Sequence, residues 1–382
     1  MRVDFVKHNE EVKKIWDGYY SGKPIRVPMI IGCNPRMILL DSKLNKKNIS
    51  FKEYSENPDI MLNVQLEFRK WVKFTIPQDM RMGLPDDGWD VNVDFQNCYD
   101  AAWFGCKIHY RDGQVPDTEP ILSGDRKNLL FDKGIPDPFT GIMKRNWDYY
   151  EYFKKKQKEG FNFEGRPIKS VIPTGLGTDG ILTCAVNLRG IEIFTDFYEN
   201  PDYVRKLFDF ITTAVIKRIK AFRKFLGQPE KSKMLWYADD SIANISTDMY
   251  REFVLPCHKK LISELAEEGP HHIHLCGDAT RHFKTIKDEL NVKSFDTGFP
   301  VDFGWLRNEL GEDVEIYGGP NINLLLMSNT IDVRKETQRI LRSGIMKGKK
   351  FVLREGNNLA PGTPIENLWA MYETVKEYGK YV

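Results

Sequence analysis

The second half of this chain is dominated by an alternation of short apolar runs with longer segments of helical periodicity. Such alternation is typical of βα units, whose strands form a parallel sheet. The clearest helix is expected from Tyr203 to about Leu226, where apolar residues recur at helical spacing. We expect strands at 169–173, 233–237, 272–276, 292–296, 314–317 and 350–354. This half of the chain therefore predicts repeated βα units.

Further strands are expected in the first half, at 26–32, 72–76 and 108–110. With these, the total reaches what a closed α/β barrel of the (β/α)8 (TIM) type requires, with catalytic groups at the carboxyl ends of the strands. The stretch 79–165 is rich in Asp, Gly, Pro and aromatic residues and has little periodicity. We therefore expect one (β/α)8 domain over 1–382, with an N-terminal extension and a loop-rich insertion at 79–165 near the barrel mouth.

Composition excludes several classes of partner. The formal net charge is only +2, so no basic field favours nucleic acid or an anionic membrane surface. The first residues carry charges throughout, and no apolar run reaches the length of a membrane span. The 6 cysteines are scattered without a CxxC pair, which argues against a disulfide scaffold. We expect a cytoplasmic protein.

The run His271–Asp278 is the most chemically dense part of the chain. If it is a strand, His272, His274 and Cys276 share one face, because side chains alternate along a strand. Imidazole nitrogen and thiolate sulfur together suit Zn²⁺, whose catalytic sites use three protein ligands and leave a fourth position open. The alternative interpretation is a buried strand end with satisfied histidines.

Four passages resemble the uroporphyrinogen decarboxylase superfamily, which includes zinc-dependent methyltransferases that work with corrinoids. They are the Gly-rich turn 173–178, the acidic strand end 237–241, the His-x-Cys-Gly of 274–277 and the tail 359–367. The resemblance implies a barrel, zinc ligation by His274 and Cys276, a separate corrinoid protein as partner, and a homodimer.

Two departures from the family pattern narrow the expected activity. Asn357 stands where the decarboxylases carry a His and the methyltransferases carry a third zinc-binding Cys. The Arg-rich N-terminal motif that decarboxylases use on their substrate is missing, since the corresponding region reads Ile31 to Arg36. Porphyrinogen decarboxylation is therefore not expected.

The third zinc ligand must come from another strand end. Glu355 is the first candidate, because it lies two residues before Asn357 and a carboxylate oxygen is an acceptable zinc ligand. The alternative for Glu355 is an ion pair with Arg354. Other candidates at predicted strand ends stay open: Asp240, Asp296, His272 and Cys33.

Zinc chemistry predicts a methyl transfer. A carboxylate in place of a thiolate ligand favours oxygen substrates, so we expect a methyl ether to give its methyl group to cob(I)alamin. Transfer between a methylated cobamide and a thiol is the alternative on the same metal. We expect a small, aromatic methoxylated substrate, because the expected mouth region within the insertion contains many aromatic residues: Trp89, Phe95, Tyr99, Trp103, Phe104 and Trp147.

The remaining site residues are assigned roles around this metal. Asp239 and Asp240 are expected to be catalytic, and Tyr237, Asn321 and Asn357 are expected to bind substrate. Two other functions stay open: a metal-free decarboxylase or lyase on the same barrel, and a barrel that binds a ligand without turnover. The segment 175–180 also fits a dinucleotide fingerprint, but it lies mid-chain among barrel units, where such a fingerprint is not expected.

Overall fold

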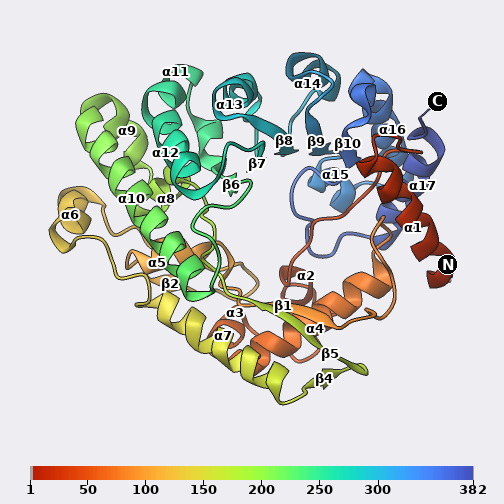
Figure 1. The fold of residues 1–382 in the computed structure, drawn as a ribbon, viewed down its shortest axis with the longest axis horizontal. Helices are drawn as coiled ribbons and strands as arrows, with labels where there is room; N and C mark the ends of the chain where they lie inside the picture. Colours follow the sequence, from red (N-terminus) through yellow and green to blue (C-terminus); the bar gives the residue numbers. More distant parts are fainter. Residues whose placement is uncertain (1–2, 382) are drawn as a thin grey trace.

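The computed structural model describes residues 3–381, and its larger sheet is made of five parallel strands. They follow the order β10-β9-β8-β7-β6, so that consecutive strands of the chain are neighbours. The strands are β6 (Trp236–Ala238), β7 (His271–Leu275), β8 (Val292–Thr297), β9 (Glu315–Gly318) and β10 (Phe351–Leu353). Helices connect them and cover their outer side (Figure 1).

A smaller sheet contains β1 (Trp89–Asn92), β5 (Arg166–Ile172) and β4 (Asn162–Phe163). β1 and β5 are parallel, and the helix α7 (Ile142–Lys158) lies between them in the chain, whereas β4 joins β5 as an antiparallel hairpin. A separate antiparallel pair is formed by β2 (Ile108–His109) and β3 (Asp117–Thr118). The first half of the chain thus also contributes a parallel βαβ crossover.

The helices follow the apolar periodicity of the sequence. In α10, the residues Leu207, Ile211, Val215, Ile219 and Phe222 are all buried, because their spacing places them on one face. The other helices are α1 (Phe5–Tyr20), α2 (Arg36–Leu39), α3 (Phe51–Glu56), α4 (Pro58–Thr75), α5 (Tyr99–Trp103), α6 (Leu129–Lys133), α8 (Ile181–Arg189), α9 (Glu192–Glu199), α11 (Thr247–Met249), α12 (Leu255–Leu265), α13 (Phe283–Leu290), α14 (Phe303–Leu310), α15 (Ile322–Met327), α16 (Thr330–Ile340) and α17 (Ile365–Tyr378); α10 itself is Pro201–Phe225.

The segment 26–31 lies beside β10 without forming a full strand. Leu353 N donates to Pro28 O (2.9 Å) and Ile30 N donates to Leu353 O (3.0 Å), which gives one parallel bridge at Met29. Pro28 has no N–H to donate to β10 and so to continue the ladder, and on the other edge of the segment Asp79 accepts from Met29 N (2.7 Å). The ladder therefore stops after one bridge.

The strands form two parallel arcs, not one hydrogen-bonded ring. Within residues 3–381, no ladder joins β5 to β6 or the segment 26–31 to β1. The fold is α/β with parallel strands, as expected, but the described backbone does not close the predicted (β/α)8 barrel. One hydrophobic core nevertheless includes residues of both arcs, among them Val91, Ile168, Ile273 and Leu353.

The strands predicted in the second half are confirmed as β5 to β10, but two in the first half are wrong. The residues 72–75 form the last turn of α4, and Ile76 is its C-cap. The helix begins after its N-cap Asn57, and its helical pattern continues to Thr75. The residues 108–110 enter the β2–β3 hairpin, not a parallel sheet. The stretch 79–165 contains β1 and α7, so it is more than an insertion of loops.

Among the described residues, no helix is both long enough and apolar enough to cross a membrane.

Candidate metal centre and cavity

The strand β7 presents its histidines as the alternation predicts. His271, Ile273 and Leu275 are buried, whereas His272 and His274 are only half-buried. Cys276 follows at the strand end and is also half-buried. The predicted face of His272, His274 and Cys276 is therefore the one that is turned away from the core.

Three donor side chains meet at this strand end. Asp240, His274 and Cys276 each offer one ligand atom, and these atoms all lie within 4.8 Å of one another. His274 Nε2 lies 3.1 Å from Cys276 Sγ, and Cys276 N donates to Asp240 Oδ1 (2.7 Å). Ligand atoms of one tetrahedral zinc ion lie roughly 3–4 Å apart, with bonds of about 2.0–2.3 Å. Oxygen, nitrogen and sulfur donors at these separations fit zinc.

His274 is oriented from behind by a carboxylate. Asp296 is its register partner on β8, and His274 Nδ1 donates to Asp296 Oδ2 (2.6 Å), which leaves Nε2 toward Cys276. Arg354 Nη1 also donates to this oxygen (2.6 Å). A carboxylate on the far nitrogen of a zinc-binding histidine fixes the ring and makes it a better ligand.

The same contacts shift the acidities of the site. Burial lowers the pKa of His274, but the hydrogen bond to Asp296 and the adjacent Cys276 raise it to about 10. Burial raises the pKa of the Cys276 thiol, although His274 opposes this shift. Burial also raises the pKa of Asp296, but His274 and Arg354 lower it below its ordinary value. A metal ion takes the place of the protons on nitrogen and sulfur when it binds.

The structure does not bring Glu355 to the three donors. Its side chain is completely buried, its Oε2 accepts from Gly32 N (2.9 Å), and its Oε1 accepts from Arg354 Nη2 (2.6 Å). Burial raises the pKa of Glu355 to about 7, although Arg354 lowers it. The carboxylate in the donor group is that of Asp240, one of the alternatives left open by the sequence.

Asp239 is likewise placed away from substrate. It is completely buried, and its carboxylate accepts from Leu182 N (3.0 Å), Thr183 N (2.9 Å) and His258 Nε2 (3.1 Å). These contacts hold the start of α8 against the end of β6. The predicted catalytic role of Asp239 does not fit this position, because no oxygen is left for a reacting group.

Tyr237 lies on the same outer face of β6 as Asp239. Its side chain is 2% exposed and packs against His258, with 5.2 Å between ring centroids. The predicted role of Tyr237 in substrate binding does not fit this position. Alternation along β6 instead turns Trp236 inward, where it is 53% exposed and stacks on His274 at 6.3 Å.

The other predicted residues are divided between the cavity and its surroundings. Asn357 lines the cavity and accepts a hydrogen bond from Cys276 Sγ (3.0 Å). Asn321 caps α15, with its Oδ1 accepting from Asn323 N (2.7 Å). His272 Nδ1 is within hydrogen-bond distance of Ser294 Oγ (2.7 Å). Cys33 lies close enough to Glu355 to be affected by its charge, and burial raises the pKa of the Cys33 thiol to about 12.

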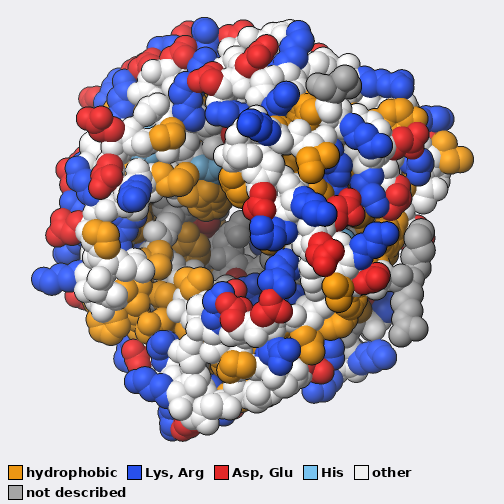
Figure 2. All heavy atoms as spheres, turned by 45° about the vertical axis from the view of Figure 1, so that its right-hand side comes forward, with side chains coloured by type: hydrophobic (Ala, Val, Ile, Leu, Met, Phe, Trp, Pro, Cys, Tyr) orange, Lys and Arg blue, Asp and Glu red, His pale blue; other side chains and the backbone are white. Residues whose placement is uncertain are grey.

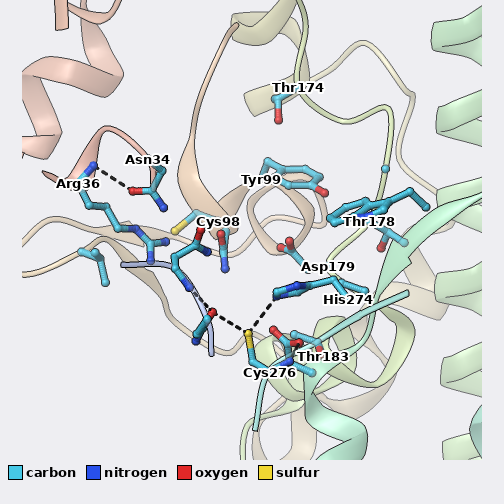
Figure 3. A pocket seen from close by; sticks show the side chains of 18 of the residues that line it. Asn34, Arg36, Cys98, Tyr99, Thr174, Thr178, Asp179, Thr183, His274 and Cys276 are labelled. Atoms are coloured by element: carbon cyan, nitrogen blue, oxygen red, sulfur yellow. Dashed lines mark hydrogen bonds between the residues drawn. The ribbon is translucent and has the colours of Figure 1, made fainter. Parts of the chain in front are cut away.

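The three donors open into a cavity of about 1220 Å³. Figure 2 shows a deep hollow in one face of the molecule, with hydrophobic and basic side chains at its rim. Figure 3 shows His274 and Cys276 on one wall, with Tyr99, Thr178 and Asp179 across from them. Sequence reasoning missed Asp179, which appeared only as a position within the dinucleotide fingerprint at 175–180.

The aromatic residues expected to hold a substrate ring are mostly core. Trp89, Phe95, Trp103, Phe104 and Trp147 are buried and belong to the hydrophobic core. Tyr99 alone of the predicted set lines the cavity. Trp236, which was not predicted, supplies a second aromatic face there.

Comparisons with known proteins agree on one family. The family model described as uroporphyrinogen decarboxylase (URO-D) matches residues 169–378. A methylated-thiol:coenzyme M methyltransferase of Methanosarcina mazei is 30% identical over 199 residues, which are 51% of this chain and 50% of that protein. A uroporphyrinogen decarboxylase of Rickettsia conorii is 26% identical over 242 residues, 60% of this chain and 64% of the relative.

A solved structure extends the likeness to nearly the whole fold. A methyltransferase from Methanosarcina mazei covers 96% of this chain and 98% of its own, with a TM-score of 0.65 and 17% sequence identity. At that identity, the likeness concerns the fold alone. The sequence matches reach only half of the first relative's length and 64% of the second's.

Proposed function

Because this chain belongs to the uroporphyrinogen decarboxylase family, we propose that it is a zinc-dependent methyltransferase within that family. The observation that carries the proposal is the donor set of Asp240, His274 and Cys276 in the wall of the cavity. Three protein ligands beside an open cavity are the arrangement of a catalytic zinc site.

A zinc ion held there supplies Lewis acidity, which stabilises negative charge on an oxygen or sulfur atom of the substrate. The chain's own residues prepare the site. Asp296 fixes the ring of His274, and Arg354 holds Asp296 in place. Asp240 accepts from the backbone of Cys276, so that the two ligands are tied together.

The substrate we propose is a small methoxylated aromatic compound. A carboxylate oxygen among the three donors makes the site harder than one with two thiolates, which favours an ether oxygen over a sulfur atom. Trp236 and Tyr99 provide aromatic faces for a phenyl ring within the same cavity. On demethylation, the electron pair of the carbon–oxygen bond stays with oxygen, which then takes a proton.

The methyl acceptor we propose is the cob(I)alamin of a separate corrinoid protein. The support is the resemblance of 274–277 to the His-x-Cys-Gly of the methyltransferase branch, whereas 173–178, 237–241 and 359–367 resemble the family as a whole. The hollow seen in Figure 2 is open to the surface, as access for a partner's cofactor requires. A homodimer and a cytoplasmic location are part of the same proposal; for the second, the support is that all the cysteines are free.

A second candidate is methyl transfer to or from a thiol. The Methanosarcina mazei relative is a methylated-thiol:coenzyme M methyltransferase, and its match covers half of this chain. A thiol would bind the same zinc ion as thiolate. The two candidates differ in the substrate atom and not in the metal ligands.

The test is a methyl-transfer assay with free cob(I)alamin. Zinc-loaded protein is mixed with methoxylated aromatic compounds and, separately, with methyl thioethers, and formation of methylcobalamin is followed by its absorbance spectrum. We expect conversion with the ethers and none with Cys276→Ala. Conversion with thioethers alone supports the second candidate. Equal formation of methylcobalamin in zinc-free protein contradicts the zinc dependence of both candidates, and no methylcobalamin from any substrate contradicts both and favours the lyase or the ligand-binding barrel.

A further inference from the structure

Asp179 is a cavity residue that the proposed zinc chemistry does not use. It belongs to the glycine-rich segment 175–180, between β5 and α8. Figure 3 places it between Tyr99 and His274, with its carboxylate in the cavity. It is not one of the three metal donors. Its position makes it a contact for a part of the substrate that does not react.

A buried ion pair holds the backbone of Asp179 in place. Arg218 and Asp100 are completely buried and form a salt bridge. Asp100 Oδ2 also accepts from Thr178 Oγ1 (2.8 Å) and Asp179 N (2.9 Å), and Arg218 Nη2 donates to Gly177 O (2.7 Å). The segment is thus tied to the interior on both sides of Thr178.

Gly180 allows the segment to pack directly against the end of the next strand. Its φ is +106°, and a Cβ there would lie 2.4 Å from the Cα of Asp239. Only glycine allows this close approach to the end of β6. The loop that carries Asp179 is therefore fixed against both β6 and the Asp100–Arg218 pair.

The carboxylate of Asp179 has been left without a partner. Its Oδ2 is buried and makes no hydrogen bond with any residue in the described range 3–381. Neighbouring acids are satisfied: Asp100 by Arg218, and Asp296 by Arg354. Burial, and next the charge of Asp100, raise the pKa of Asp179 well above its ordinary value. Asp179 as a whole is half-buried, and a carboxylate with one buried, unpaired oxygen is costly unless another group compensates its charge.

Arg36 does not supply the missing partner. It lines the same cavity, but its Nε donates to Gln96 Oε1 (2.6 Å), and no ion pair joins it to Asp179 among the described residues. The charges of Arg218 and Arg36 lower the pKa of Asp179, but less than burial and Asp100 raise it. A cationic group of a ligand in the cavity would meet the exposed part of this carboxylate and compensate its negative charge.

We propose that Asp179 determines substrate specificity by binding a protonated amino group of the methyl donor. An ammonium group donates up to three hydrogen bonds and is attracted by the face of an aromatic ring such as Tyr99. A cationic group stabilises the ionised form of Asp179, which neither an anionic nor an apolar group does. This inference rests on the proposed function for the reacting end of the substrate and adds an aminoalkyl arm at the other end.

The test measures binding, not turnover, so that it is independent of methyl transfer. Isothermal calorimetry compares para-methoxyphenethylamine with para-methoxyphenethyl alcohol and para-methoxyphenylacetate, on zinc-loaded protein and on protein treated with a chelator. We expect the amine to bind about ten- to a hundredfold more tightly than the alcohol, and the acetate to bind most weakly. The order is the same without zinc, which separates this result from a failure of the zinc proposal.

Asp179→Asn is the variant that decides, with Asp117→Asn as its matched control. Asp117 also lines the cavity, but it is exposed and paired with Arg111. We expect Asp179→Asn to reduce the preference for the amine to within about twofold and Asp117→Asn to keep it. A preference that survives in Asp179→Asn, or a wild type that does not prefer or does not bind the amine, overturns the proposal.

A stability measurement guards against a merely structural effect. Without ligand, we expect Asp179→Asn to unfold at a higher temperature than wild type, because the change removes an unpaired buried charge. A folded but less stable variant would show that Asp179 is satisfied within the protein, and this too overturns the proposal. Asp179→Ser serves as the second variant if the first does not fold.

Discussion

At the end of β7 the polar groups are paired with one another, whereas the loop after β5 holds a carboxylate that has no partner among the described residues. His274 and Cys276 lie on β7 and at its end and contact each other, and Asp296 on β8 contacts His274. Asp179 is instead fixed by a buried ion pair behind it. We therefore assign metal binding to the end of β7 and ligand recognition to the loop after β5.

The largest effect is expected on the β7 wall. Cys276→Ala removes the sulfur ligand, so the protein should lose its zinc and methyl transfer should fall to background. Cys257→Ala is the control, because Cys257 is buried in the core and is not near the donor group. Zinc content and methylcobalamin formation are measured on both. Full activity in Cys276→Ala would show that the end of β7 does not hold a catalytic metal, and the contrast with the Asp179 loop would fail.

The next effect tests the support behind the β5 loop. Arg218→Met leaves Asp100 buried without its partner, and we expect a loss of about 3–5 kcal/mol in the free energy of unfolding. The double variant Asp100→Asn with Arg218→Met should recover part of this loss. Urea unfolding followed by circular dichroism measures each variant. A loss below about 1 kcal/mol in Arg218→Met would show that the pair does not hold the loop.

A smaller effect is expected from the carboxylate behind His274. Asp296→Asn keeps the size of the side chain but removes the charge that fixes the ring, so zinc affinity should fall about 10- to 100-fold. Competition with a chromogenic chelator gives the affinity. Asp302→Asn, a change in the cap of α14, is the control. Unchanged affinity in Asp296→Asn would mean that His274 is oriented by other contacts.

The smallest effect on the metal is expected at Glu355. Glu355→Gln should change zinc affinity by less than about threefold, because its carboxylate contacts Gly32 and Arg354 and not the donor group. Asp240→Asn, measured beside it, should weaken zinc far more. The reverse order would restore Glu355 as the third ligand and remove Asp240 from the site.

The sequence predicted the β7 face because one regular strand carries it. Alternation alone puts His272, His274 and Cys276 together, and the structure shows that pattern of burial. The same rule was available on β6, where Tyr237 and Asp239 share the outer face and Asp240 lies on the inner one. Adjacent acids at a strand end could have been separated by this argument.

Other parts of the site depend on contacts between distant segments. Glu355 faces Gly32, and Asp179 depends on Asp100, which is far from it in the chain. No local pattern predicts such pairs. The pairing of the strands shows the same limit. β1 pairs with β5 but lies in a stretch of weak periodicity, and Pro28 interrupts the ladder between the segment 26–31 and β10. The number of strands could therefore be predicted approximately, but not which strands pair.

The central claim is that Asp240, His274 and Cys276 hold zinc, and X-ray absorption at the zinc edge tests it most directly. The measurement uses wild-type protein purified from zinc-containing medium, with Cys276→Ala beside it. We predict about one zinc ion per chain, with a single sulfur at about 2.3 Å and nitrogen or oxygen ligands at about 2.0–2.2 Å. Protein without zinc, or a zinc ion whose ligands include no sulfur, would contradict the account.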